Sequence, residues 1–278
     1  MLSICHLLSI EGGDFMGNTE QNDDSMVYSL DSKPFGLTYG DWTVEWWQWI
    51  LSMPENINPL FDMTGERSNI NQTKQVWFLA GTYQGEAQRT CTIPAGRAIL
   101  FPVINIECSY TENPDIENDS ELSASCKFLI DQVTKRTACL DGIILEDSRV
   151  QSQIFDVTFR KENIWEVEQG PTQAISDGYW VFLKPLPAGN HTIHFSGEAS
   201  FSNYSVAKHV RYNLMVEDLH TEIKHISPSP PEIEAADKIV FNPNKMINDE
   251  YYSTVYKGNK YFLRKINDKF IDLYEGLL

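Results

Sequence analysis

The chain of 278 residues is long enough for one large β domain or for two domains of ordinary size. Hydrophobic residues make up 42% of it, yet no stretch approaches the roughly 18 consecutive apolar residues that a membrane-spanning helix needs. The net charge of −17 at pH 7 argues against nucleic acid and anionic lipid as partners, because both carry charge of the same sign.

The first 35 residues are predicted to form a disordered acidic leader. No lysine or arginine precedes Lys33, and the acidic residues before it are Glu11, Asp14, Glu20, Asp23, Asp24 and Asp31. The weakly apolar segment 2–10 lacks the basic flank and the small-residue cleavage site of a secretory signal. Residues 1–35 are therefore expected to lie outside the folded domain, which we place at residues 36–225.

A tryptophan-rich segment over residues 39–54 is the most informative part of the chain. Four of the seven tryptophans fall within eight residues, namely Trp42, Trp46, Trp47 and Trp49. The segment fits a helix that Thr38 or Asp41 caps and that Pro54 ends. Its main apolar stripe predicts a helix packed under a sheet. Trp47 lies beside that stripe and is the indole that we expect to remain exposed for a ligand.

Short β-type runs separated by turn residues fill the middle of the chain. They lie at residues 75–83, 89–93, 97–106, 138–146, 154–159, 164–167, 178–184, 191–195 and 208–216. Pro102 within its run predicts an edge or a β-bulge, and Asp141-Gly142 predicts a tight hairpin. Many short strands without an alternation of strands and helices are typical of a mainly β fold, a β-sandwich or jelly roll.

One further helix is expected to interrupt the strands and to carry a cysteine. Ser120 would cap it, and its apolar stripe is Leu122, Cys126, Leu129, Ile130 and Val133. Cys108 ends a strand-like run, so a disulfide to Cys126 would close a loop of about 17 residues and contribute about 3 kcal/mol. The alternative is a set of buried free thiols, which would also include Cys91 and Cys139.

The last segment, residues 226–278, is predicted to be a linker followed by a short tail. Ser227-Pro228-Ser229-Pro230-Pro231 is typical of a linker. A hairpin is expected over residues 253–263 around Gly258-Asn259, followed by a helix over residues 266–277 whose apolar residues recur at helical spacing. This tail would dock on the main domain or on a partner.

Several motifs together resemble a known family. The chain reads Y-G-D-W-T-V-E-W-W-Q-W, N-P-L-F-D-M-T-G, V-W-F-L-A-G-T and R-T-C-T-I-P-A-G-R-A-I-L-F-P-V-I-N-I-E-C, and later S-D-G-Y-W-V-F-L-K-P-L-P-A-G-N-H-T-I-H-F. Over residues 36–217 it resembles a family of uncharacterised exported proteins from bacteria and ammonia-oxidising archaea. The resemblance implies an extracytoplasmic protein and no particular reaction. Members often carry a further cysteine after the T-G, whereas this chain has Glu66-Arg67-Ser68-Asn69, which implies an unpaired Cys91.

The sequence contains candidates for two kinds of catalytic site, a pair of carboxylates and a metal site. Glu45 and Glu107 lie in aromatic or apolar segments, and a pair of carboxyls about 5–10 Å apart can cleave a glycosidic bond. His194 could bind a metal with Glu107 or Glu198, although its spacing of three from His191 places the two histidines on opposite faces of a strand. The alternatives are salt bridges and buried hydrogen bonds. No nucleophile motif or phosphate loop is present, and we predict no cofactor.

The sequence therefore favours a non-catalytic surface or binding protein outside the cytoplasm. Its ligand would be a glycan, a cation or another envelope protein, contacted by Trp47 with Asp41 and Trp46. A hydrolase that uses Glu45 and Glu107, or a metal at His194, is the first alternative. A structural component of the envelope, with the tail as its docking arm, is the second.

Overall fold

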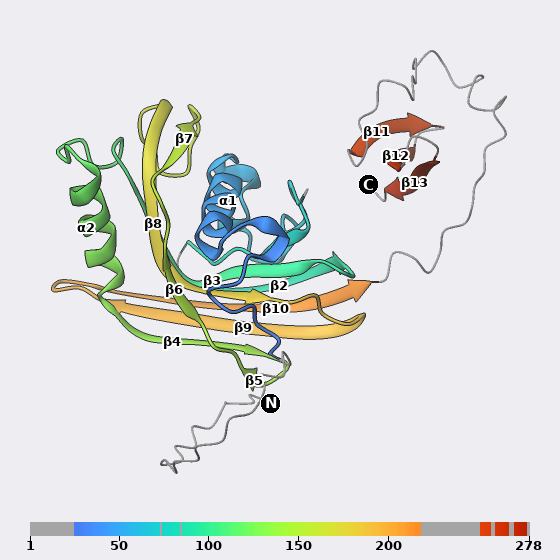
Figure 1. Cartoon of the computed structure of the whole chain (residues 1–278), viewed down its shortest axis with the longest axis horizontal. Helices are drawn as coiled ribbons and strands as arrows, with labels where there is room; N and C mark the ends of the chain where they lie inside the picture. Colours follow the sequence, from blue (N-terminus) through green and yellow to red (C-terminus); the bar gives the residue numbers. More distant parts are fainter. Residues whose placement is uncertain are drawn as a thin grey trace, which may run out of the picture. The chain divides into compact units, whose positions relative to one another are not determined.

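The computed structural model describes residues 25–72, 74–83 and 85–217, together with the backbone of three strands between residues 251 and 276. The chain divides into two compact units, Met1–Asp218 and Leu219–Leu278. Figure 1 shows the larger unit as two β-sheets accompanied by the helices α1 and α2. Neither of these helices is long and apolar enough to span a membrane.

The larger unit contains two five-stranded sheets. In the first, the strand order is β1-β3-β8-β6, and β7 also pairs with β8. Its strands are β1 (Val76–Phe78), β3 (Ala98–Ser109), β6 (Ser148–Gln151), β7 (Phe155–Phe159) and β8 (Gly170–Leu183). The second has the order β2-β10-β9-β4-β5 and consists of β2 (Gly85–Pro94), β4 (Val133–Leu140), β5 (Ile143–Ile144), β9 (Gly189–Ser200) and β10 (Ser205–Glu217). The predicted mainly β, two-sheet architecture is confirmed, although two of its strand pairs, β1 with β3 and β2 with β10, are parallel.

Apolar side chains form two core layers, one on each side of the first sheet. One layer combines side chains of both sheets, among them Phe101, Val181, Phe195 and Tyr212. In the other layer, the helix α1 (Tyr39–Leu51) packs on the opposite face of the first sheet, against side chains that include Leu100, Trp180 and Phe182. The strand β3 is buried on both faces for most of its length, which explains its continuous apolar run. Its register against β8 shifts between Pro102 and Ile104, the bulge that the proline predicted.

The tryptophan-rich helix α1 is fixed by its cap and by its indoles. Thr38 and Asp41 form a capping box, because each side chain accepts a hydrogen bond from the backbone N–H of the other. Three indole N–H groups donate to backbone carbonyls outside the helix: Trp42 to Pro34 at 2.9 Å, Trp46 to Leu79 at 3.0 Å and Trp49 to Ile70 at 2.9 Å. The predicted core role of the main stripe is confirmed, since all three indoles are buried.

The helix α2 (Asp119–Ile130) begins slightly earlier than predicted. Asn118, not Ser120, caps it, because the Asn118 side chain accepts a hydrogen bond from the backbone N–H of Glu121 at 3.1 Å. Cys126 on this helix is buried beside Cys108 of β3, as the sequence suggested. The predicted disulfide between them is wrong, since no disulfide joins the described cysteines. Both remain thiols, and Cys126 Sγ lies 3.6 Å from the carbonyl oxygen of Ile175, at the distance of a weak S–H···O hydrogen bond. Cys91 is likewise unpaired, as the resemblance implied.

The hairpin between β4 and β5 forms as predicted, with Asp141 and Gly142 at φ values of 51° and 86°. The Asp141 carboxylate accepts a hydrogen bond from the backbone N–H of Thr192 at 2.7 Å and lies 2.7 Å from His191 Nδ1. The other ring nitrogen of His191 lies 2.9 Å from the carbonyl oxygen of Pro187. Both nitrogens thus face acceptors, an arrangement that favours the protonated imidazolium.

The domain boundaries differ in part from those predicted. Val27 forms a β-bridge with Leu183, and the Tyr28 N–H donates to the carbonyl of Phe182 at 2.8 Å. Residues 25–35 therefore belong to the domain and not to a leader, because the end of β8 beyond its pairing with β6 leaves backbone groups to which they hydrogen-bond. Residues 1–24 and the proline-rich segment 227–231 lie outside the described residues.

The smaller unit contains a three-stranded antiparallel sheet, which consists of β11 (Tyr251–Tyr256), β12 (Asn259–Ile266) and β13 (Phe270–Gly276). The predicted hairpin is confirmed by the pairing of β11 with β12. The predicted helix over residues 266–277 is wrong, because this segment contains β13, which pairs with β12. Its apolar residues have helical spacing, but pairing with a neighbouring strand overrides so short a pattern.

Candidate ligand-binding site

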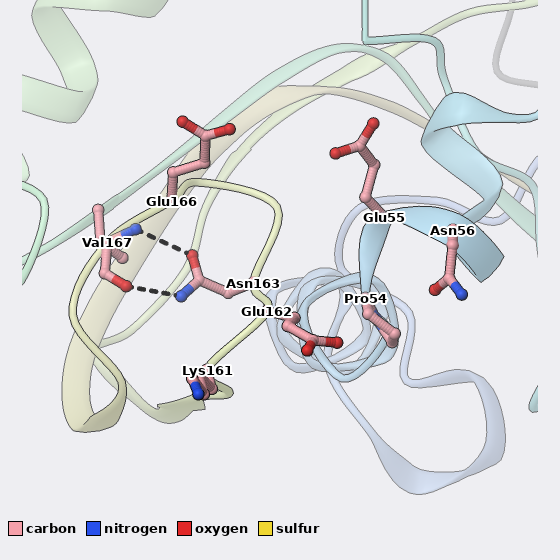
Figure 2. Close-up of a pocket in the computed structure, with 8 residues that line it drawn as sticks. All are labelled: Pro54, Glu55, Asn56, Lys161, Glu162, Asn163, Glu166 and Val167. Atoms are coloured by element: carbon pink, nitrogen blue, oxygen red, sulfur yellow. Dashed lines mark hydrogen bonds between the residues drawn. The ribbon is translucent and has the colours of Figure 1, made fainter.

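A pocket of about 460 Å³ opens between two loops beyond the C-terminal end of α1. Its lining residues are Pro54, Glu55, Asn56, Lys161, Glu162, Asn163, Glu166 and Val167 (Figure 2). The first three come from the loop after α1, and the others come from the loop that joins β7 to β8. The volume lies within the range of roughly 300–1,000 Å³ that is usual for small-molecule sites.

Two buried asparagines hold the walls of this pocket in shape. The Asn163 side chain donates to the carbonyl oxygens of Arg160 and Val167, both at 2.8 Å, and accepts from the N–H groups of Trp165 and Val167. Figure 2 shows the pair of bonds to Val167. In the loop after α1, Asn58 donates to the carbonyl oxygens of Ile50 at 2.8 Å and Met53 at 3.1 Å, and it accepts from the Leu60 N–H at 3.0 Å. Because these side chains satisfy backbone groups that water would otherwise solvate, they stabilise the conformation of both loops.

The lining of the pocket is predominantly acidic. It contains the three carboxylates of Glu55, Glu162 and Glu166 and the single ammonium of Lys161. Figure 2 shows the Glu55 and Glu166 carboxylates on opposite walls. The pocket therefore offers hydrogen-bond acceptors to a ligand that carries hydroxyl or amino groups.

Three aromatic residues on the same loops and on the segment after β1 form a partly exposed surface, which we call the aromatic ledge: Phe61, Tyr83 and Trp165. The rings of Phe61 and Tyr83 are stacked with centroids 5.0 Å apart, and the ring of Trp165 lies 6.3 Å from that of Tyr83. Tyr83 is 47% exposed, and Trp165 is half-buried. The ledge thus presents an exposed ring packed against Phe61 and Trp165, which belong to the segments that also supply the pocket lining.

The expectation that Trp47 would remain exposed is wrong, since its side chain is only 3% exposed. Trp165, from the loop before β8, lies against it with a ring separation of 6.5 Å, and Trp46 lies against its other side at 5.0 Å. This loop was predicted to contain a strand at residues 164–167, whereas it forms a turn that covers the flank of α1. Tyr83, and not Trp47, is the exposed aromatic residue beside these loops, and the sequence analysis missed it.

Next to the ledge, the side chain of Glu107 is buried, and that of the neighbouring Glu112 is half-buried. Glu107 Oε2 accepts a hydrogen bond from Trp165 Nε1 at 3.1 Å, while Glu112 Oε2 accepts from the Ser109 hydroxyl at 2.6 Å and from the Ser109 N–H at 3.2 Å. Burial and the neighbouring Glu112 raise the pKa of Glu107 well above its usual range. Burial also raises the pKa of Glu112, although its hydrogen bonds with Ser109 act in the opposite direction. Both shifts favour the protonated form of these carboxyls.

The loop that carries Phe61 is anchored by a fully buried arginine. Arg89 Nε donates to the carbonyl oxygen of Asp62, and its Nη1 donates to the Ala80 carbonyl oxygen and to the Tyr212 hydroxyl, all at 2.6 Å. The Asp62 carboxylate accepts from backbone N–H groups of its own loop; although burial raises its pKa, these hydrogen bonds give a net lowering. An arginine at an inward-facing position of β2 is the sequence signal that would have revealed this anchor.

No protein-family model, curated protein or solved structure matches this chain. The candidate site therefore rests on its own geometry.

The carboxylates proposed for catalysis do not form a pair. Glu45 makes a salt bridge with Lys74 at a smaller pocket of about 180 Å³, whereas Glu107 is hydrogen-bonded to Trp165 and Glu112. Among the described residues, no hydrogen bond connects the two sets. The arrangement gives the hydrolase built on Glu45 and Glu107 no support.

The remaining predicted residues also have structural partners. Asp41 is part of the helix cap, where its hydrogen bonds with Thr38 lower its pKa, and Trp46 is fully buried. His194 lies between Arg211 and Cys139 on the neighbouring strands. Within the described part of the chain, no group of three histidine, cysteine, aspartate or glutamate side chains is arranged to hold a metal ion.

Proposed function

We propose that this protein is a non-catalytic binding protein whose ligand is a glycan. The observation that carries the proposal is the exposed ring of Tyr83, stacked on Phe61, close to the loops that form a preordered acidic pocket. One face of a pyranose ring presents C–H groups, which pack on an aromatic face, and its hydroxyl groups donate hydrogen bonds to carboxylates. The ledge and the pocket supply these two kinds of contact on adjoining segments.

The acidic lining also indicates what kind of glycan is preferred. A neutral or amino sugar is favoured, because the carboxylates of the pocket would repel an acidic one. The extracytoplasmic location that the resemblance implies is part of this proposal, since glycans of this kind are abundant outside cells.

Calorimetric titration with cellohexaose, chitohexaose and the glucosamine hexamer tests the proposal. We expect at least one of these oligosaccharides to bind the full chain, and we expect Tyr83→Ala to weaken that binding about tenfold or more, which corresponds to about 1.4 kcal/mol. Glu166→Gln should weaken it as well, because it removes an acceptor charge from the pocket.

Tyr204→Ala is the matched control. Tyr204 is another exposed tyrosine, and it is stacked on a phenylalanine, Phe201, with a ring separation of 4.6 Å, but it lies in the turn between β9 and β10. Its loss should leave the affinity unchanged. An oligosaccharide that binds equally well to the wild type and to Tyr83→Ala would contradict the proposed site, and absence of binding by all three would contradict the glycan class.

A further inference from the structure

The outer face of the second sheet carries three basic side chains on two neighbouring strands. Phe195 of β9 and Val210 of β10 are buried in the core between the sheets, so the residues next to them in sequence point outward. Arg211 is exposed, and the two histidines are partly exposed. The three outward-facing basic residues are His194 on β9 and His209 and Arg211 on β10.

The register of the sheet brings these three side chains together. His194 lies directly opposite Arg211, and His209 lies opposite Ser196, two residues along β9 from His194. Residues directly opposite have Cβ atoms about 4.5–5.5 Å apart, and diagonal neighbours lie about 7–8 Å apart. On its other side, His194 faces Cys139 of β4. Burial is the main cause that lowers the pKa of His194, and the charges of His209 and Arg211 lower it further.

No carboxylate is paired with any of these basic groups. In the part of the chain that the structure describes, none of the three side chains forms an ion pair or a hydrogen bond. Glu198 on the same face of β9 is held by Lys135 of β4, with 2.9 Å between the ammonium nitrogen and the carboxylate oxygen. Glu86 of β2 lies opposite His209 in the register, but no ion pair joins them. The cluster therefore keeps donors and charge that a ligand could use.

The net charge of the cluster depends on the protonation of its two histidines. When both imidazoles are protonated, they and Arg211 carry three positive charges, of which the Glu86 carboxylate offsets one. When both imidazoles are neutral, only the charge of Arg211 remains, and Glu86 balances it. The three cations also repel one another, so an anion placed between them would relieve that repulsion.

We propose that His194, His209 and Arg211 form a pH-dependent binding site for a tetrahedral oxyanion, a sulfate or phosphate group. Arg211 supplies a permanent charge and a planar fork of donors, and the protonated imidazoles add further N–H donors. The site lies on the second sheet and does not depend on the proposed glycan pocket. Because the net charge of −17 opposes a long polyanion, we expect the ligand to be a small free ion.

Titration of the isotopically labelled full chain with sodium sulfate, followed by nuclear magnetic resonance at constant ionic strength, tests this proposal. Sulfate is a suitable probe because its charge stays the same between about pH 5 and about pH 8, the range in which histidine titrates. We expect sulfate to bind the wild type at least tenfold more tightly at the acidic end of this range. By linkage, bound sulfate should raise the measured pKa of His194.

Four variants separate the contributions to the site. Arg211→Gln should weaken sulfate binding about tenfold or more at the acidic end, which corresponds to about 1.4 kcal/mol. The matched control is Arg160→Gln, which replaces another exposed arginine without a side-chain partner among the described residues, after β7 of the first sheet, and should change nothing. The double variant His194→Gln, His209→Gln should bind equally weakly at both pH values. Glu86→Gln should strengthen binding at the alkaline end, a gain that misfolding cannot produce.

Three results would overturn the proposal: a wild type that does not bind sulfate at the acidic end, equal affinity at both ends of the pH range, or an Arg211→Gln variant that binds as the control does. A heparin hexasaccharide, titrated in the same way, distinguishes the source of the oxyanion. Tighter binding of the hexasaccharide than of free sulfate, lost in Arg211→Gln, would assign the site to a sulfated glycan. Weaker binding would assign it to the free ion.

Discussion

Two adjacent tryptophans of α1 allow the contribution of one buried hydrogen bond to the free energy of unfolding to be measured. Trp46 and Trp47 are 0% and 3% exposed, and replacement of either by phenylalanine removes the same atoms from the same helix. The difference lies in their indole N–H groups. That of Trp46 donates to the carbonyl oxygen of Leu79 at 3.0 Å, whereas that of Trp47 has no partner among the described residues.

The expected difference in stability follows from this contrast. Trp46→Phe leaves the buried Leu79 carbonyl without its indole donor, at a cost of about 1–3 kcal/mol in addition to the lost packing. Trp47→Phe loses similar packing but also removes a buried N–H that lacks a partner, which offsets part of that loss. We therefore expect Trp46→Phe to be less stable than Trp47→Phe by about 2 kcal/mol. For a domain of this size, the gap corresponds to about 4–8 °C in Tm.

Urea unfolding of the full-length variants, followed by circular dichroism, would measure the two free energies. Circular dichroism is preferable to fluorescence here because each variant lacks an indole. Equal losses, or a larger loss for Trp47→Phe, would refute the reasoning, because either result would mean that the Trp47 N–H is also satisfied in the folded protein. Acrylamide quenching adds an independent check, since Trp47→Phe should not remove a highly accessible fluorescent component.

Four further predictions concern stability. Arg89→Met should lower the free energy of unfolding by about 2 kcal/mol or more, because the buried Asp62 carbonyl loses its charged donor; equal stability in urea would contradict this. Burial lowers the pKa of His191, but hydrogen bonds to the Asp141 carboxylate and the Pro187 carbonyl raise it more. The stability that His191 contributes should therefore be complete below its ordinary pKa and should disappear as the pH rises through the raised value. A His191→Gln variant whose stability varies with pH as that of the wild type does would contradict this prediction. Gly178→Ala should lower the free energy of unfolding by about 1–3 kcal/mol, because the added Cβ would lie 2.6 Å from Cβ of Asn105. Gly81→Ala, with open space around the added Cβ, should change the free energy of unfolding little in the same urea experiment. Deletion of residues 219–278 should leave the unfolding transition of the larger unit unchanged, and a shift in its oligomeric state on light scattering would support a docking role for the tail.

Residue patterns within short segments predicted the helix α1 and the β4–β5 hairpin correctly. The spacing of Trp42, Trp46 and Trp49 indicated a buried stripe, and the cap residues of α1 were recognisable from the sequence alone. The hairpin at Asp141-Gly142 followed from the positive φ values that this dipeptide tolerates. These features depend on residues within a few positions of each other, so their physical causes are visible in a short stretch of sequence.

Part of the candidate site depends on contacts between distant segments and was not predicted. Glu107 was predicted to be a candidate catalytic carboxylate, but its neighbours, Glu112 and Trp165, come from a turn and a loop whose positions no local pattern reveals. The helix expected in the tail was wrong for a related reason, since the pairing of β13 with β12 overrides a short apolar spacing.

Composition, periodicity and turn chemistry thus determined the β class, the buried helix and the position of the hairpin. The tertiary structure decided which aromatic side chain is exposed, because Trp165 covers Trp47 and leaves Tyr83 in contact with solvent. It also decided that Cys108 and Cys126 lie together as thiols and that Glu107 is buried against Trp165. The physical reason is that the exposure and ionisation of a side chain depend on every segment packed against it, whereas the period of a helix or strand depends on its own sequence.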